Sequence, residues 1–113
     1  MDLASKKCVP CKAGTPKLGS ERIAELIEHV DRWETKDDRL LKTFKFENFV
    51  RAIEFVNRVA EVAEQEQHHP DFCVHYGRVD FTLWTHAVGG LSENDFILAA
   101  KIDRAAKIDP GAA

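Results

Sequence analysis

Four of the five histidines of this chain lie within one short stretch, at His68, His69, His75 and His86. The imidazole is the side chain whose unperturbed pKa, about 6.5, allows it both to donate and to accept a proton near neutral pH. Glu64 stands one helical turn before His68, so a carboxylate could orient that imidazole if a helix reaches it. These residues are the first candidates for chemistry in the sequence.

Residue types alone leave three interpretations of the cluster open: unremarkable surface histidines, a zinc site, or acid–base catalysis. Against zinc, His68 and His69 are adjacent rather than at a chelating i, i+4 spacing, and no cysteine pair stands at a suitable distance. His75 should point away from its neighbours Val74 and Tyr76 on a strand. We therefore expect it at the surface, outside the cluster.

Residues 1–19 precede any periodic pattern. They contain Cys8-Val9-Pro10-Cys11 and further Pro and Gly residues, which predicts a flexible N-terminal arm. Cys8 and Cys11 could form a redox pair or half a zinc site, with reduced thiols as the default. With Cys73 the cysteines make an odd count, which does not suggest a secreted disulfide framework. No apolar signal-peptide segment follows Met1, so a cytoplasmic protein is expected.

Two amphipathic helices are expected before the histidines. The first would be capped by Ser20 and would bury the stripe Ile23, Leu26, Ile27 and Val30. The second, the strongest in the chain, would run from about Glu47 to Gln67. It ends near the two histidines because Pro70 disfavours helix at His69. Its buried face is predicted to consist of Phe49, Ala52, Ile53, Val56, Ala60 and Ala63.

Four strands are expected in two hairpins, over residues 33–35 and 39–46, then 73–76 and 78–86. In the second strand, Leu40, Phe44 and Phe46 share one face, as the two-residue period requires. In the last, His86 would share a face with Trp84 and Thr82.

A third helix should start at the capping-box pattern Ser92-Glu93-Asn94-Asp95 and continue to about Lys107, with Pro110–Ala113 as a tail. The order is then α-β-β-α-β-β-α. Short links between strands favour antiparallel pairing. The fold class is therefore α+β, a four-stranded antiparallel sheet with three helices on one face, in a single domain over residues 20–108.

Composition excludes some functions. The chain has 113 residues and a formal charge of −3, which argues against direct nucleic-acid binding as its main task. No run of about 18 apolar residues exists, so no membrane span is expected.

The spacing of several residues resembles one family, the pterin-4a-carbinolamine dehydratases. The segment from Glu64 through His68-His69-Pro70 is followed by Tyr76, by Thr85-His86, and by Gly90-Leu91-Ser92 with Asp95. That family has an acidic residue before a His-His-Pro triplet, an aromatic after it, a third histidine and an aspartate beyond. The similarity extends from about Cys8 to about Lys107.

The resemblance implies a reaction and roles for its residues. The reaction is the dehydration of 4a-hydroxy-tetrahydropterin to quinonoid dihydropterin, which supports tetrahydropterin recycling for aromatic amino acid hydroxylation. His68 and His86 would transfer protons, and His69 would help to bind the pterin. Glu64 and Asp95 would orient imidazoles, although Asp95 could equally just complete a helix cap.

Two aromatic residues, Trp84 and Tyr76, are candidates for contact with the pterin. No metal and no organic cofactor are implied, and a homodimer or homotetramer is expected. The alternative, also found among relatives of this family, is a non-catalytic oligomeric interaction module such as a transcription coactivator or an assembly factor.

Overall fold

The computed structural model describes residues 2–107, in which three α-helices and four strands follow the predicted order. Two short 3-10 turns, η1 and η2, accompany them. The bounds are η1 Leu3–Ser5, α1 Ser20–Ile27, β1 Glu34–Lys36, β2 Arg39–Lys45, α2 Phe49–Glu66, β3 Asp71–His75, β4 Arg78–Leu83, η2 His86–Val88 and α3 Glu93–Ala106.

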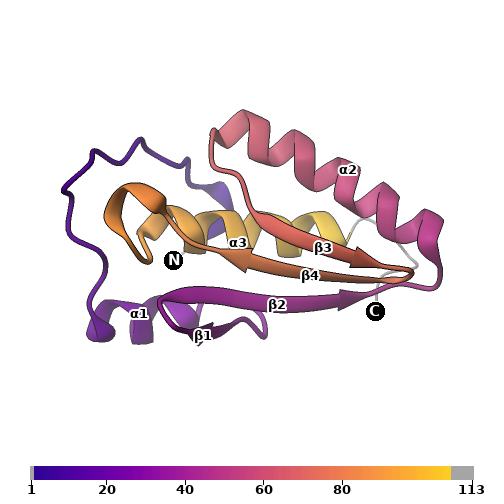
Figure 1. Cartoon of the computed structure of the whole chain (residues 1–113), viewed down its shortest axis with the longest axis horizontal. Coiled ribbons are helices and arrows are strands. Elements are labelled where there is room, and N and C mark those ends of the chain that lie inside the picture. The colour runs from indigo at the N-terminus through magenta and orange to yellow at the C-terminus, as the bar shows by residue number, and fades with distance from the viewer. Residues whose placement is uncertain (1, 108–113) are drawn as a thin grey trace.

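The strands form one antiparallel sheet in the order β1-β2-β4-β3, which confirms the expected α+β class (Figure 1). Leu40 pairs with Leu83 and Phe44 with Val79, so the apolar residues of β2 and β4 share one face. The residues that alternate with them, such as Thr43 and Asp80, lie on the opposite face. This alternation is what a sheet covered by helices on one side requires.

An aromatic cluster joins the sheet to α2. The ring of Phe55 lies against Phe44, Phe46 and Phe81, with centroids 4.9, 4.8 and 5.8 Å away. Each of these residues is less than a tenth exposed. Burying such a side chain contributes roughly 1.5–3 kcal/mol, so the cluster holds the sheet and the helix in fixed register.

The ends of α2 have local causes. Asn48 caps its start, where the side-chain oxygen accepts a hydrogen bond of 3.0 Å from the backbone amide of Arg51. Gln67 ends it by adopting the left-handed conformation, with φ of 53°. The helix is therefore one to two residues shorter at each end than the sequence predicts.

The buried face of α2 differs in part from the predicted one. Ala52 and Ala63 are buried as expected, but Phe49 is half exposed and Ala60 is exposed. Two residues outside the expected stripe, Phe55 and Val59, are buried instead. Apolar residues cover two adjacent faces of this helix, and its packing on the sheet and α3 selects one of them.

Three further boundaries also differ from the prediction. Gly19, not Ser20, is the N-cap of α1, and the helix ends at Ile27, before Val30. β4 ends at Leu83 because the chain then turns into η2, which a bridge between Thr85 and Gly90 closes. The capping box at Ser92 and Asp95 is present as predicted.

The N-terminal arm lies against α3. Leu3 is buried, and the ammonium of Lys101 donates a hydrogen bond of 2.9 Å to the carbonyl of Ala4. Lys6 and Glu93 form an ion pair at 2.7 Å. The predicted tail at Pro110–Ala113 lies outside the described residues. Within residues 2–107, no helix is both long and apolar enough to cross a bilayer.

Candidate active site

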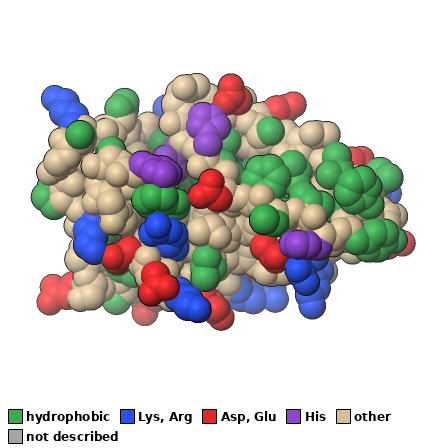
Figure 2. Space-filling model, viewed as in Figure 1, with side chains coloured by type: hydrophobic (Ala, Val, Ile, Leu, Met, Phe, Trp, Pro, Cys, Tyr) green, Lys and Arg blue, Asp and Glu red, His purple; other side chains and the backbone are tan. Residues whose placement is uncertain are grey.

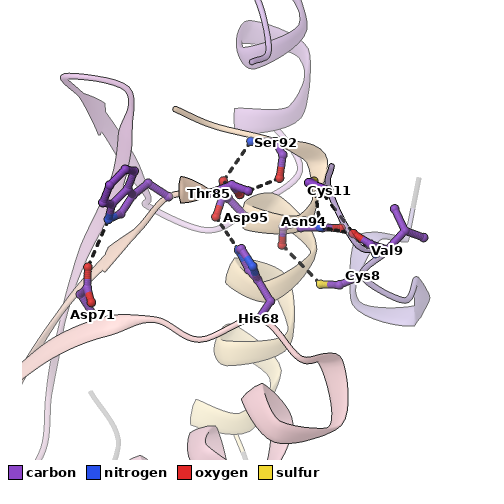
Figure 3. Close-up of polar contacts among 10 residues, drawn as sticks. Cys8, Val9, Cys11, His68, Asp71, Thr85, Ser92, Asn94 and Asp95 are labelled. Atoms are coloured by element: carbon purple, nitrogen blue, oxygen red, sulfur yellow. Dashed lines mark hydrogen bonds and ion pairs between the residues drawn. The ribbon is translucent and has the colours of Figure 1, made fainter. Parts of the chain in front are cut away.

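His68 leaves the end of α2 and points at the first turn of α3 (Figure 3). Its Nε2 lies 2.7 Å from Oδ1 of Asp95. The Asp95 side chain is 0% exposed and that of His68 is 13% exposed, so a buried carboxylate holds an imidazole that keeps a small opening to solvent. A carboxylate in this position fixes the orientation of the ring.

Glu64 contacts the other histidine of the pair. Its Oε2 is hydrogen-bonded to Nε2 of His69, not to His68 as the helical spacing predicted. The left-handed Gln67 breaks the helix before His68, so the i, i+4 relation between Glu64 and His68 does not apply. Both side chains of the Glu64–His69 pair are more than half exposed, so solvent weakens their interaction.

His86 stands at the start of η2 and stacks on Trp84. The two ring centroids are 3.7 Å apart, with a tilt of 40° between the planes. The guanidinium of Arg39 lies 3.8 Å from the centroid of Trp84, and the indole N–H donates a hydrogen bond of 3.2 Å to Asp71. Much of the indole face is therefore already covered by groups of this chain, and the indole fixes the place of His86.

Two short segments thus meet where β3 begins and β4 ends. Residues 68–71 and 84–86 are joined by the Asp71–Trp84 hydrogen bond and by Asp95, which accepts hydrogen bonds from both sides. His69 follows His68 in the chain, and His86 follows Thr85, whose hydroxyl is hydrogen-bonded to Asp95. Figure 2 shows histidine side chains near each other on one face, and another histidine side chain apart from them beside Lys or Arg side chains.

The structure does not bring Tyr76 to this group. Tyr76 lies in the β3–β4 turn with φ of 53° and is 71% exposed. The length of β4, about 3.3 Å per residue, separates it from Trp84. His75 is exposed as expected, with its Nε2 3.7 Å from a carboxylate oxygen of Asp80.

The sequence alone assigned no role to three residues near the histidines: Arg39, Asp71 and Thr85. A buried or half-buried indole N–H needs a hydrogen-bond acceptor. Trp84 therefore indicated that an acceptor, which the structure shows to be Asp71, would lie nearby. Nothing local to Thr85 or Arg39 indicated their contacts, because those cross from one element to another.

The arm borders this end of α3. Asn94 exchanges two hydrogen bonds with the backbone of Val9, and the Cys8 thiol lies 3.6 Å from the carbonyl oxygen of Asn94. Burial, with the Glu66 carboxylate beside it, raises the pKa of the Cys8 thiol to about 12. Cys8, Cys11 and Cys73 are free thiols.

Two other features of residues 2–107 bear on the location of a site. No three His, Cys, Asp or Glu side chains in this part of the chain gather as a metal ion would require. A groove of about 360 Å³ lies between α1 and the β1–β2 turn, and no histidine lines it. The histidine end of the sheet remains the stronger candidate because it combines imidazoles, which can titrate near neutral pH, with buried hydrogen-bond partners.

Comparison with known proteins identifies relatives over most of the chain. The family model described as pterin 4 alpha carbinolamine dehydratase matches residues 16–105. A protein of Rubrobacter xylanophilus with that provisional name is 48% identical over 104 residues, which cover 91% of this chain and 97% of the relative. One from Nitrosomonas eutropha is 50% identical over 103 residues, which cover 90% and 91%.

Two solved structures resemble this one. A transcriptional coactivator/pterin dehydratase from Brucella melitensis is 33% identical, with a TM-score of 0.76, and the match covers 79% of this chain and 97% of that one. A pterin dehydratase-like protein identified as a RuBisCO assembly factor of the alpha-carboxysome is 24% identical, with a TM-score of 0.56. That match covers 68% and 89% of the two chains, and it supports the fold alone.

Proposed function

The chain belongs to the pterin 4 alpha carbinolamine dehydratase family, and we propose that it removes water from 4a-hydroxy-tetrahydropterin to give quinonoid dihydropterin. The reaction would return the pterin used by an aromatic amino acid hydroxylase to a form that a reductase can recycle. The observation that carries the proposal is the His68–Asp95 pair, in which a buried carboxylate orients the imidazole of His68.

The chemistry needs an acid and a base. Hydroxide is a poor leaving group, so an acid near C4a protonates it and the C–O bond breaks as water departs. A base accepts the proton lost from a ring nitrogen, which balances the elimination. His68 and His86 are the proton-transfer residues of this proposal, because each imidazole is held by a partner of its own, Asp95 or Trp84.

His69 binds the pterin and shares its proton. Its exposed ring and its contact with Glu64 support a binding role, since an accessible imidazole can donate to a planar polar ligand. Arg39 and His86 cover much of the indole face of Trp84. Trp84 therefore positions His86 and contacts the pterin only with the edge of its ring that remains uncovered. A role for Tyr76 at this site lacks support from its position in the β3–β4 turn.

The proposed reaction uses no metal and no organic cofactor, because it needs proton transfer rather than the activation of water. We expect full turnover to survive exhaustive chelation. Loss of turnover on chelation, with recovery when zinc is added, would overturn this part of the proposal. A cytoplasmic location fits the three free thiols, which a reducing compartment preserves.

A homodimer or homotetramer is also part of the proposal. Four large apolar side chains, those of Phe49, Val50, Phe72 and Tyr76, are between 43% and 71% exposed at the start of α2 and on the β3–β4 hairpin. Figure 2 shows hydrophobic side chains gathered at the right of the molecule. β3 is an edge strand, so its unpaired backbone groups lie open as well. The molecular mass measured by light scattering at micromolar concentration should exceed the 12.8 kDa of one chain.

A second function, an oligomeric interaction module, is favoured by the same apolar surface and by the coactivator name of the Brucella melitensis relative. The two candidates differ in what they require of the histidines. An interaction module has no use for a buried carboxylate that orients an imidazole, whereas a dehydratase does.

The test of the main proposal is turnover of chemically generated 4a-hydroxy-tetrahydropterin by the full chain. Each rate must be corrected for the spontaneous dehydration, measured in the same buffer without protein. Dehydration well above that background supports the enzyme. A rate equal to the background would leave the interaction module as the better account.

A further inference from the structure

Two buried hydroxyl groups lie between the end of β4 and the start of α3. Thr85 and Ser92 are 6% and 9% exposed. The Oγ1 of Thr85 is 2.8 Å from Oγ of Ser92 and 2.8 Å from Oδ2 of Asp95 (Figure 3). Because each hydroxyl owns a single proton, the direction of every hydrogen bond in this group can be assigned.

The assignment starts from the acceptors. The carbonyl oxygen of Ser92 accepts the backbone N–H of Asp95 at 3.1 Å, and Oδ2 of Asp95 accepts the backbone N–H of Ser92 at 2.9 Å. An ionised carboxylate only accepts, so Thr85 donates its proton to Asp95. The Ser92 hydroxyl must then donate to Thr85. The chain of donors therefore runs from Ser92 through Thr85 to Asp95.

This order has a consequence for His68. With two donors on Oδ2, the other oxygen of Asp95 faces Nε2 of His68 at 2.7 Å and accepts its proton. A neutral imidazole carries one ring proton, so His68 is then the Nε2–H tautomer and its lone pair is on Nδ1. Within residues 2–107, no hydrogen bond occupies that Nδ1.

We propose that Thr85 is a positioning residue that acts through Asp95 to hold His68 as the Nε2–H tautomer, with Nδ1 free to exchange a proton with the substrate. The role in turnover rests on the proposed dehydration, but the tautomer does not. The backbone of Thr85 also pairs with Gly90, with N–H to carbonyl at 2.8 Å, and the next residue is His86. One residue thus supports both proton-transfer histidines, the first by its hydroxyl and the second by its backbone.

A matched pair of substitutions separates the hydroxyl from the shape of the side chain. Thr85→Val keeps the branched side chain and removes the donor to Asp95, while Thr85→Ser keeps the donor. A merely structural role would lower the free energy of unfolding in Thr85→Val and leave the tautomer and the pH profile of turnover unchanged. Ser92→Ala removes the first donor of the chain and serves as a second variant if Thr85→Val does not fold.

The experiment is ¹⁵N NMR of histidine-labelled full chain at a pH where the imidazoles are neutral, with turnover and KM of the same samples. We expect His68 of the wild type to carry its proton on Nε2. Thr85→Val should mix the tautomers, lower turnover by about 10-fold with little change in KM, and alter the pH–rate profile. Thr85→Ser should stay close to the wild type, and Ser92→Ala should fall between them.

Two results would overturn the inference. One is a wild-type His68 that carries its proton on Nδ1. The other is a folded Thr85→Val, or a folded Ser92→Ala if the first variant does not fold, with the tautomer and pH profile of the wild type. If the wild type has no turnover above background, the proposed function fails, and the tautomer measurement still decides the role of Thr85 toward His68.

Discussion

Helix α3 carries two buried carboxylates, Asp95 in its first turn and Asp103 toward its end, which are 0% and 8% exposed. Both are surrounded by donors. Asp103 accepts hydrogen bonds from the Trp33 indole at 3.0 and 3.1 Å, from the backbone of Asp31 at 3.2 Å, and from the Lys42 ammonium at 2.7 Å. Each carboxylate ties α3 to a different part of the sheet.

Asp95 and Asp103 differ in the chemical type of their hydrogen-bond partners. The donors around Asp103 are an indole, an amide and an ammonium, none of which normally changes its protonation near neutral pH. One oxygen of Asp95 is occupied by Thr85 and Ser92, and the other faces an imidazole. Burial and hydrogen bonding alone therefore do not distinguish a structural carboxylate from one that we propose is functional. The partner that can titrate does.

The largest effect should come from removing the titrating partners. We expect His68→Ala and His86→Ala each to lower turnover by roughly 100-fold or more, since general acid–base catalysis contributes about 10²- to 10⁴-fold. The two variants could differ in preference for the two C4a stereoisomers. The measurement is initial-rate kinetics of the dehydration, corrected for background. His69→Ala should instead raise KM more than it lowers turnover.

His75→Ala is the matched control for these variants, because His75 is exposed on β3 and its imidazole lies near Asp80. It should keep the wild-type rate. An equal loss in the His75 variant would mean that the site has been misplaced, and no loss in any of the four would reject the enzyme.

The second prediction concerns the contribution of Asp103 to the free energy of unfolding. Asp103→Asn leaves the Lys42 ammonium, 11% exposed, without its nearest counter-charge, and we expect the free energy of unfolding to fall by about 3 kcal/mol. Urea unfolding followed by circular dichroism measures this. Turnover per folded molecule should be unchanged. A clear loss of turnover in this folded variant would contradict the division of roles between the two carboxylates.

The same substitution at the other carboxylate should act mainly on turnover. Asp95→Asn removes the charge that orients His68. At metal-bound histidines, loss of such an orienting partner lowers metal affinity or activity by roughly 10- to 100-fold, and we expect turnover to fall by a similar factor here. Some stability is lost too, because the capping box weakens. Kinetics and unfolding of the same preparation separate the two effects. A variant of Asp95 with full turnover would make both carboxylates structural.

The smallest expected effect is on the pH dependence of stability. It comes from the Cys8 thiol, which lies beside Asn94 at the start of α3 but makes no hydrogen bond to Asp95. Burial raises the pKa of the Cys8 thiol from 9.0 to about 12, so folding favours the protonated thiol. Its contribution to stability is complete below about pH 9 and is lost as pH rises toward 12. Between pH 9 and 10.5 the wild type should therefore lose free energy of unfolding faster than Cys8→Ala does.

The exposed Cys73 supplies the control, since Cys73→Ala should keep the pH slope of the wild type. In the same range, iodoacetamide should modify the Cys8 thiol slowly. Rapid modification of Cys8 at pH 9 would mean that the arm does not stay on α3.

Much of the fold follows from local sequence signals. The two-residue alternation in β4 fixes which side chains enter the core, and Val79, Phe81 and Leu83 are all buried as it predicts. The capping box at Ser92 sets the start of α3, and Pro70 with the histidines marks the end of α2. The His-His-Pro spacing identified the family and its candidate histidines.

Contacts between distant elements needed the tertiary structure. The period of α2 did not reveal which of its two apolar faces turns inward, because Phe55 and Phe49 are equally apolar and only packing against the sheet distinguishes them. Helical spacing paired Glu64 with His68, but one left-handed residue, Gln67, reassigned it to His69 and gave His68 to Asp95.

Local patterns in the sequence set the order of the elements and the alternation of the strands, and they supply the residue types available for acid–base chemistry. These depend on periodicity and on short-range sterics, which act between residues close in the chain. Tertiary packing set which carboxylate contacts which histidine, that Thr85 donates to Asp95, and that Trp84 stacks on His86. Those pairings join residues up to 27 positions apart, so they follow from how β4, α2 and α3 pack and not from any local pattern.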